Sequence, residues 1–213
     1  MNTISHVIKV HEFYDEEATK ENVLRALQDR KPQWFVHYDH GSEYVMWGDD
    51  EQPIIDLSNL DQLAGTHVYC MNCSSGKGLG VHAIDKGILE YLGYNEVVSF
   101  TTDAKEEFGS VFNYGIVMAM EEKKWLKDIV EPMRENGYQV AEQLLSEGKI
   151  FGSSCMVNDM NILHVYYKDG PEPPDPECWF SRQAKRLFGW NGLWFLRMLR
   201  QKLFARASLR WNS

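Results

Sequence analysis

Two apolar runs, each followed at once by a polar turn with glycine, constrain the fold of this chain most strongly. The first run, residues 34–38, is followed by the turn at 39–41, and the second run, residues 66–72, by the turn at 73–80. Uninterrupted aromatic and β-branched runs of this length are typical of buried strands. The carboxyl ends of neighbouring parallel strands meet at one edge of a sheet. We therefore expect the two turns to lie side by side.

The rest of the pattern alternates between strands and helices. Thr19 is suited to cap a helix over 19–29, in which Val23, Leu24 and Leu27 form one apolar stripe. Further segments are predicted as a strand at 6–13, a hairpin at 41–56 turning at 48–50, a helix at 81–92, a strand at 96–101, helices at 105–122 and 138–147, and a strand at 161–167. This order predicts an α/β fold, a three-layer α/β/α sandwich around a mostly parallel sheet covered on both faces.

Composition divides the chain into three parts. A body at 1–170 precedes a proline-rich linker at 171–178, which favours an extended backbone, and a tail at 179–213. The tail carries eight Lys or Arg and no Asp or Glu, which leaves 14 basic against 31 acidic residues in the remainder. We expect the acidic body to repel nucleic acid, so direct nucleic-acid binding is not predicted.

The tail combines its basic residues with apolar and aromatic ones, as expected of an amphipathic helix. Three uses fit that composition: docking on the body itself, contact with an anionic membrane, and binding of a partner protein. The sequence leaves all three open.

Location is predicted as cytoplasmic, with membrane association through the tail as an alternative. No run of about 18 apolar residues occurs, and the first residues lack a basic segment followed by an apolar one. The four cysteines, Cys70, Cys73, Cys155 and Cys178, are therefore expected to be reduced thiols.

His40 and Cys73, one in each of the two turns, form the candidate catalytic pair. A thiol needs a nearby base to become a strong nucleophile, and an imidazole supplies one. Three other interpretations fit these residues: a structural histidine beside a buried cysteine, a redox pair formed by Cys70 and Cys73, and a zinc site. The zinc site is disfavoured because His67 and His82 do not give a familiar ligand spacing. The glycines at 76–80 fit neither the Walker nor the dinucleotide-binding spacing, which favours flexibility beside the cysteine over phosphate binding.

At these residues the chain resembles the caspase and gingipain class of cysteine peptidases, and CHAT domains most closely. The matching features are Ala18-Thr19 at a helix start, the His-x-x-His-Gly of residues 37–41, the leucine-rich approach at 57–63, and the glycine-rich turn, helix and strand of 76–101. The resemblance covers roughly residues 18–120.

The resemblance implies a role for each motif residue. Cys73 is the expected nucleophile and His40 the general acid and base. The backbone N–H groups of Gly41 and Cys73 are expected to form the oxyanion hole, and His37 to support the site from the core. Members selective for basic residues often carry Asp two positions before the cysteine, where this chain has Met71, so Asp103 is the preferred candidate for a substrate-binding acid.

The resemblance therefore implies a cysteine endopeptidase that acts on a protein substrate, without a metal or cofactor. It also implies a regulatory or sensor protein partner and a role in a bacterial pathway such as antiviral defence or programmed death. The alternatives are a non-catalytic caspase-like module that docks partners or membrane through the tail, and a thiol redox protein.

Overall fold

The computed structural model describes residues 10–122 and 124–168, and residues 12–168 of this range belong to a single unit. The strands are β1 (Trp34–Tyr38), β2 (Gly41–Ser42), β3 (Val45–Trp47), β4 (Pro53–Asp56), β5 (His67–Met71), β6 (Glu90–Tyr94) and β7 (Leu163–Tyr167). The α-helices are α1 (Lys20–Arg30), α2 (Val81–Ala83), α3 (Lys105–Glu122), α4 (Leu126–Ser146) and α5 (Ile150–Ile162).

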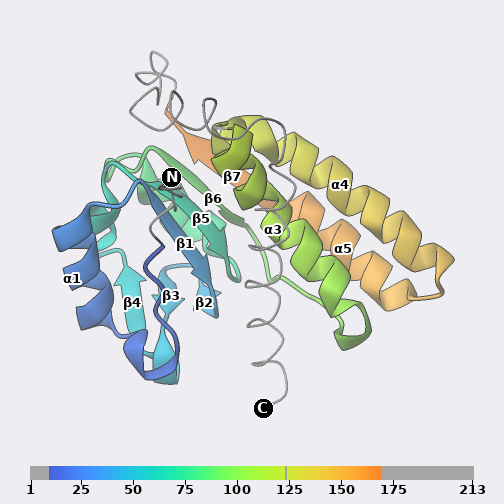
Figure 1. Cartoon of the computed structure of the whole chain (residues 1–213), viewed down its shortest axis with the longest axis horizontal. Coiled ribbons are helices and arrows are strands. Elements are labelled where there is room, and N and C mark those ends of the chain that lie inside the picture. The colour runs from blue at the N-terminus through green and yellow to red at the C-terminus, as the bar shows by residue number, and fades with distance from the viewer. Residues whose placement is uncertain (1–9, 123, 169–213) are drawn as a thin grey trace, which may run out of the picture. The chain divides into compact units, whose positions relative to one another are not determined.

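The central sheet has the strand order β1-β5-β6-β7 (Figure 1). β1 pairs with β5 and β5 with β6 in parallel, whereas β7 runs antiparallel to β6. A separate small antiparallel sheet has the order β2-β3-β4. The prediction of an α/β fold is therefore confirmed, while the central sheet is mixed, with two parallel pairings and one antiparallel pairing.

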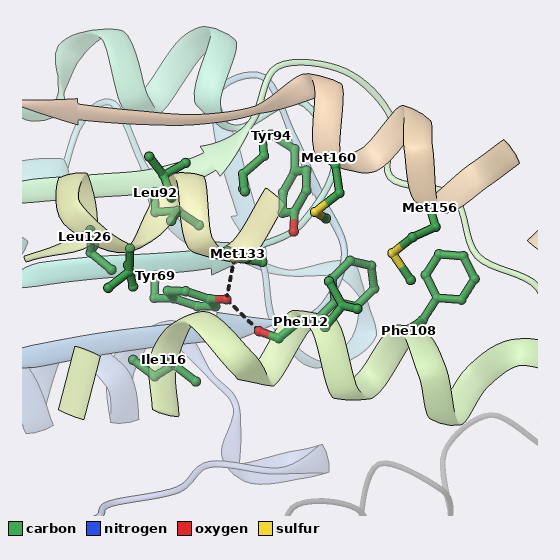
Figure 2. Close-up of a cluster of buried hydrophobic side chains, with 14 of the residues drawn as sticks. Tyr69, Leu92, Tyr94, Phe108, Phe112, Ile116, Leu126, Met133, Met156 and Met160 are labelled. Carbon is green, nitrogen blue, oxygen red and sulfur yellow. Dashed lines mark hydrogen bonds between the residues drawn. The ribbon is translucent and has the colours of Figure 1, made fainter. Parts of the chain in front are cut away.

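One face of the central sheet is covered by the three long helices α3, α4 and α5 (Figure 1). Side chains of β5 and β6 pack there with apolar side chains of the helices, as Figure 2 shows. Tyr69 reaches from β5 into this cluster, where its hydroxyl lies 2.5 Å from the carbonyl oxygen of Phe112 and 3.4 Å from Sδ of Met133. That contact satisfies the polar end of a fully buried aromatic ring.

The opposite face is covered by α1, by the small sheet and by the turn that follows β5. Its buried cluster includes Val23 and Leu27 of α1, Met46 and Ile55 of the small sheet, and Leu79. Thr19 caps α1 as predicted, since its side-chain oxygen accepts a hydrogen bond from Asn22 N at 3.3 Å. Both faces of the central sheet are thus covered except at the β1 edge, and the layer on this side combines a helix with strands.

Two predicted elements around β6 were wrong. The helix predicted at 81–92 ends after Ala83, and residues 90–94 form the fully buried strand β6 in place of the strand predicted at 96–101. Gly87 adopts a left-handed φ of 84° that breaks the helix. Glu90 opens β6 with a buried carboxylate, and a charged residue at that position concealed the strand pattern.

Other boundaries also differ from the prediction. β1 is an edge strand with exposed Val36 and Tyr38, so its aromatic run does not mark a central strand. Helix α4 begins at Leu126, well before the predicted 138, and contains Pro132; helix α5 was not predicted. Residues 10–13 form no strand, while 6–9, the linker and the tail at 179–213 lie outside the described residues.

The hairpin predicted at 41–56 is present as β3 and β4, with the additional short strand β2 before them. Within the described part of the chain, no helix is both long enough and apolar enough to span a membrane.

Candidate active site

His40 and Cys73 lie at equivalent positions beyond two paired strands. Tyr38 and Met71 form the last registered pair of β1 and β5, and each candidate residue follows its strand two positions later. Gly41 packs directly on the neighbouring turn, because a Cβ placed there would lie only 2.6 Å from Nδ2 of Asn72. The structure therefore brings the two predicted motifs together, and only glycine allows the approach at position 41.

A buried histidine and amide connect the two strand ends. Nε2 of His37 lies 2.9 Å from the carbonyl oxygen of Trp47, and Nδ2 of Asn72 lies 3.1 Å from Nδ1 of His37. The two contacts fit a neutral ring that donates from Nε2 and accepts at Nδ1. Burial lowers the pKa of His37, which keeps the ring neutral, against smaller opposing effects of the Trp47 carbonyl and Asp39. His37 therefore lies buried between the two strand ends, and its supporting role in catalysis stays a prediction.

The glycine-rich turn after Cys73 packs against the turn between β2 and β3. Residues Gly76–Gly80 form a π-helical turn, and Leu79 N donates a 2.9 Å hydrogen bond to the carbonyl oxygen of Glu43. A Cβ at Gly78 would overlap that same carbonyl group. The glycines therefore permit close backbone packing, and single π-helical turns are often found at functional sites.

Cys73 is partly buried beside an irregular segment at residues 95–101. Its Sγ lies 4.0 Å from the carbonyl oxygen of Val98, a residue packed against the helical-side cluster. The next residue, Ser74, has a left-handed φ of 59° and donates its N–H to the carbonyl oxygen of Glu96 at 2.9 Å. A left-handed non-glycine residue stores strain, and such residues cluster at active sites and ligand clamps.

His40 has an exposed side chain and a fixed backbone. Its N–H donates to Oδ1 of Asp39 at 2.7 Å, and its carbonyl oxygen accepts from Trp47 N at 3.1 Å. No hydrogen bond joins the imidazole of His40 to Sγ of Cys73 within the described residues. In unliganded active sites such contacts are often long, and they tighten when substrate binds.

Asp103, the predicted substrate-binding acid, lies in the 3-10 turn Thr102–Ala104 that precedes α3. Its side chain is exposed, and its carboxylate forms no ion pair or hydrogen bond with the candidate pair in the described structure. Gly41, predicted to contribute to the oxyanion hole, is paired with Met46 in the small sheet. The structure thus brings His37 and Gly41 onto Asn72, the residue before Cys73, and shows no such contact for Asp103 in the described residues.

Cys70 points to the face of the sheet that the small sheet covers, whereas Cys73 lies beside Val98, which packs against the helical-side cluster. It is fully buried in the small-sheet cluster, with Sγ 3.8 Å from Sδ of Met46. Burial raises the pKa of its thiol to about 12. A thiol that stays protonated is a poor redox partner, so the structure argues against the Cys70–Cys73 pair.

Sequence reasoning missed a buried carboxylate next to this site. Asp159, on the unpredicted helix α5, is fully buried, and its Oδ1 accepts a 3.0 Å hydrogen bond from Ser99 N. Its Oδ2 has no hydrogen-bond partner, and the same is true of Oδ1 of Asn72 and Oγ of Ser75. No motif marks Asp159, because a single polar residue in an apolar helix gives a sequence no signal of what it contacts.

Within residues 10–122 and 124–168, no group of three or more His, Cys, Asp or Glu side chains is arranged to hold a metal ion. His67, a candidate zinc ligand from the sequence, instead pairs its Nδ1 with Oε2 of Glu90 at 2.9 Å. Comparisons of the chain with protein-family models, with curated proteins and with solved structures returned no match.

Proposed function

We propose that the protein is a cysteine endopeptidase with Cys73 as nucleophile and His40 as general acid and base. One observation carries the proposal: β1 and β5 end in register, and the Gly41 backbone packs on Asn72, so a thiol and an imidazole follow adjacent strand ends. The left-handed Ser74 and the π-helical turn after Cys73 support it, because such features concentrate at functional sites.

The proposed reaction begins when His40 takes the proton from Sγ of Cys73 and the sulfur attacks a peptide carbonyl carbon. The carbonyl oxygen becomes an oxyanion, which the N–H groups of Gly41 and Cys73 stabilise. His40 then gives its proton to the leaving amine as the C–N bond breaks, which leaves a thioester on Cys73. Water, deprotonated by His40, attacks the thioester and releases the carboxylic acid and the free thiol.

The His37–Asn72 contact supports this reaction by holding the two turns at a fixed spacing. Alignment of a nucleophile and its base accounts for a large share of catalytic rate, and small displacements are costly. A neutral His37 suits this role, since its Nδ1 must accept the amide N–H of Asn72.

The finer parts of the proposal follow the resemblance to CHAT domains. They are a caspase-like arrangement of the sandwich, a protein substrate bound with help from Asp103, and control by a partner protein in a bacterial defence or cell-death pathway. The protein is proposed to act in the cytoplasm, and the basic tail at 179–213 is proposed to contact the partner, an anionic membrane or the body.

Proteolysis by matched variants tests the proposal. The full chain, alone and with cell lysate to supply a partner, is incubated with a mixture of unlabelled proteins, and new peptide termini are identified by mass spectrometry. We expect Cys73→Ala and His40→Ala to abolish the cleavages, and Cys155→Ala and His82→Ala to retain them. Cleavage that persists in Cys73→Ala, or is lost equally in all four variants, would overturn the assignment.

A non-catalytic interaction module is the alternative, favoured by the lack of a hydrogen bond between His40 and Cys73. In that case neither Cys73→Ala nor His40→Ala changes what the protein binds, and no variant-dependent cleavage is detected.

A further inference from the structure

One peptide group separates the thiol of Cys73 from the buried carboxylate of Asp159. The carbonyl oxygen of Val98 faces Sγ of Cys73 at 4.0 Å, and the N–H of Ser99 donates to Oδ1 of Asp159 at 3.0 Å. This carbonyl and this N–H belong to the same peptide bond. Thiol, peptide and carboxylate therefore form a continuous chain from the candidate nucleophile to helix α5.

The carboxylate at the end of this chain has few partners. Asp159 is fully buried, and its Oδ2 has no hydrogen-bond partner. Burial raises the pKa of Asp159 to about 7, against the opposing effect of the Ser99 N–H and the Asn158 side chain. A buried carboxyl group that ionises near neutral pH beside a candidate site is more typical of a functional residue than of one that only fills the core.

The groups around Asp159 come from each neighbouring element. Tyr94 approaches from β6 and Cys155 from one turn earlier in α5, and the charge of Asp159 acts on the pKa of both. Arg134 of α4 binds the carbonyl oxygens of Met160 and Leu163 at the end of α5. At the other end of α5, Lys149 is paired with Glu107 and Glu147. Each of these cations has an anionic or carbonyl partner of its own.

We propose that Asp159 is a positioning residue that, when ionised, restrains Cys73 in its protonated form through the Val98–Ser99 peptide. A carboxylate that accepts from the N–H polarises the peptide and makes its carbonyl oxygen more negative. That oxygen faces the thiol and accepts its S–H, a contact that only the protonated sulfur can make.

The restraint is released in two ways. Protonation of Asp159 weakens the polarisation of the peptide, and displacement of residues 95–101 by a substrate or partner removes the carbonyl oxygen from the thiol. The inference rests on the proposed role of Cys73 as nucleophile, and it adds a resting state in which that nucleophile is held back.

Alkylation of Cys73 by iodoacetamide tests the restraint without requiring proteolysis. The full chain carrying Cys155→Ala and Cys178→Ala is alkylated between pH 5 and pH 9, and modification of Cys73 is followed by peptide mass spectrometry. The parent is compared with Asp159→Asn, which keeps an oxygen acceptor for Ser99 and removes the charge. Glu142→Gln, an exposed change on α4, serves as the control for loss of a carboxylate.

We expect the ratio of the Asp159→Asn rate to the parent rate to be near one below pH 6, where Asp159 is protonated in the parent. Between pH 7 and pH 8 the ratio should rise to about fivefold, because only the parent then carries the charge. Glu142→Gln should follow the parent throughout. A ratio that is constant with pH, or a lower rate in Asp159→Asn, would overturn the proposal.

A second variant separates positioning from charge. Asp159→Leu removes the acceptor, and hydrogen exchange at the Ser99 amide should then accelerate at least tenfold relative to Asp159→Asn. Equal exchange in the two variants would contradict the positioning role. If Asp159→Leu does not fold, the pH profile of Asp159→Asn alone decides. A pH-dependent ratio in a protein without peptidase activity would sustain the restraint and refute only the proposed function.

Discussion

The two ends of the central sheet each hold a buried histidine, and the two sites are built differently. At the amino end, His67 pairs with Glu90, whose Oε2 also accepts from Leu126 N at 2.8 Å and whose Oε1 accepts from Lys127 N at 3.0 Å. Trp34 stacks on the His67 ring with centroids 4.6 Å apart. At the carboxyl end, the amide bound to His37 and the hydroxyl of Ser75 each leave a buried oxygen without a partner.

The difference distinguishes polar groups that stabilise the fold from polar groups that are left available for chemistry. Both oxygens of Glu90 have partners, and they cap the start of helix α4, so this polar group secures the fold. At the carboxyl end, the left-handed backbone of Ser74 and the unpaired oxygens of Asn72 and Ser75 each lower the stability of the fold. The fully paired carboxylate of Glu90 thus secures the fold, whereas the unpaired oxygens of Asn72 and Ser75 lie at the end where we propose that substrate binds.

The largest expected effect is at the amino end. Glu90→Ala should destabilise the protein by about 3–5 kcal/mol, because His67 loses its buried partner and the first amides of α4 lose their acceptors. Urea unfolding followed by circular dichroism measures the change. Asp103→Ala, at an exposed carboxylate near the other end, should stay within about 0.5 kcal/mol. Equal losses for the two variants would break the comparison.

The pH dependence of stability should isolate Asp159. A buried carboxyl with a raised pKa of about 7 stabilises the fold most below its unfolded pKa, and that contribution is lost as pH rises toward 7. Asp159→Asn should therefore gain on the parent by about 3 kcal/mol between pH 4 and pH 7, with no further gain above. The buried His37 contributes in the opposite direction below its ordinary pKa, but it is common to both proteins. A difference that does not vary with pH would show that Asp159 does not titrate there.

Close packing of the two turns should make Gly78→Ala costly. Its new methyl group would overlap the carbonyl group of Glu43, and such overpacking costs about 1–3 kcal/mol. Thermal unfolding measures the loss, and hydrogen exchange of the Leu79 amide should accelerate as its bond to Glu43 opens. Unchanged exchange at Leu79 would mean that the turns are not held together by this contact.

The smallest expected effect concerns the connection between the strand ends. Asn72→Ala removes the hydrogen bond to His37 and should cost about 1 kcal/mol in stability. Gln28→Ala provides the matched control. It removes an exposed hydrogen bond from the Gln28 amide to Gln62, and this loss should cost less than about 0.5 kcal/mol in stability. A larger loss for Gln28→Ala would contradict the view that the buried amide holds the site.

The sequence predicted the strands of the site and their order, because local patterns define them. The run at 34–38 and the cap at Thr19 each depend on neighbouring residues, and both were found. The strand β6 was predicted at the wrong residues because Glu90, its first residue, is charged. Its burial depends on hydrogen bonds from α4, which lies far along the chain. Asp159 was missed for the same reason: its partner Ser99 is 60 residues away, and no local pattern reports such a contact.

Proximity of His40 and Cys73 is the central claim, and chemical cross-linking measures it most directly. Full-length protein with Cys155→Ala, Cys178→Ala and His40→Cys is treated with dibromobimane, a short reagent that bridges two thiols, and the joined peptides are identified by mass spectrometry. We predict a single bridge between positions 40 and 73, with no such bridge when His82→Cys replaces His40→Cys. A bridge from Cys73 to position 82 but not to position 40 would contradict the account.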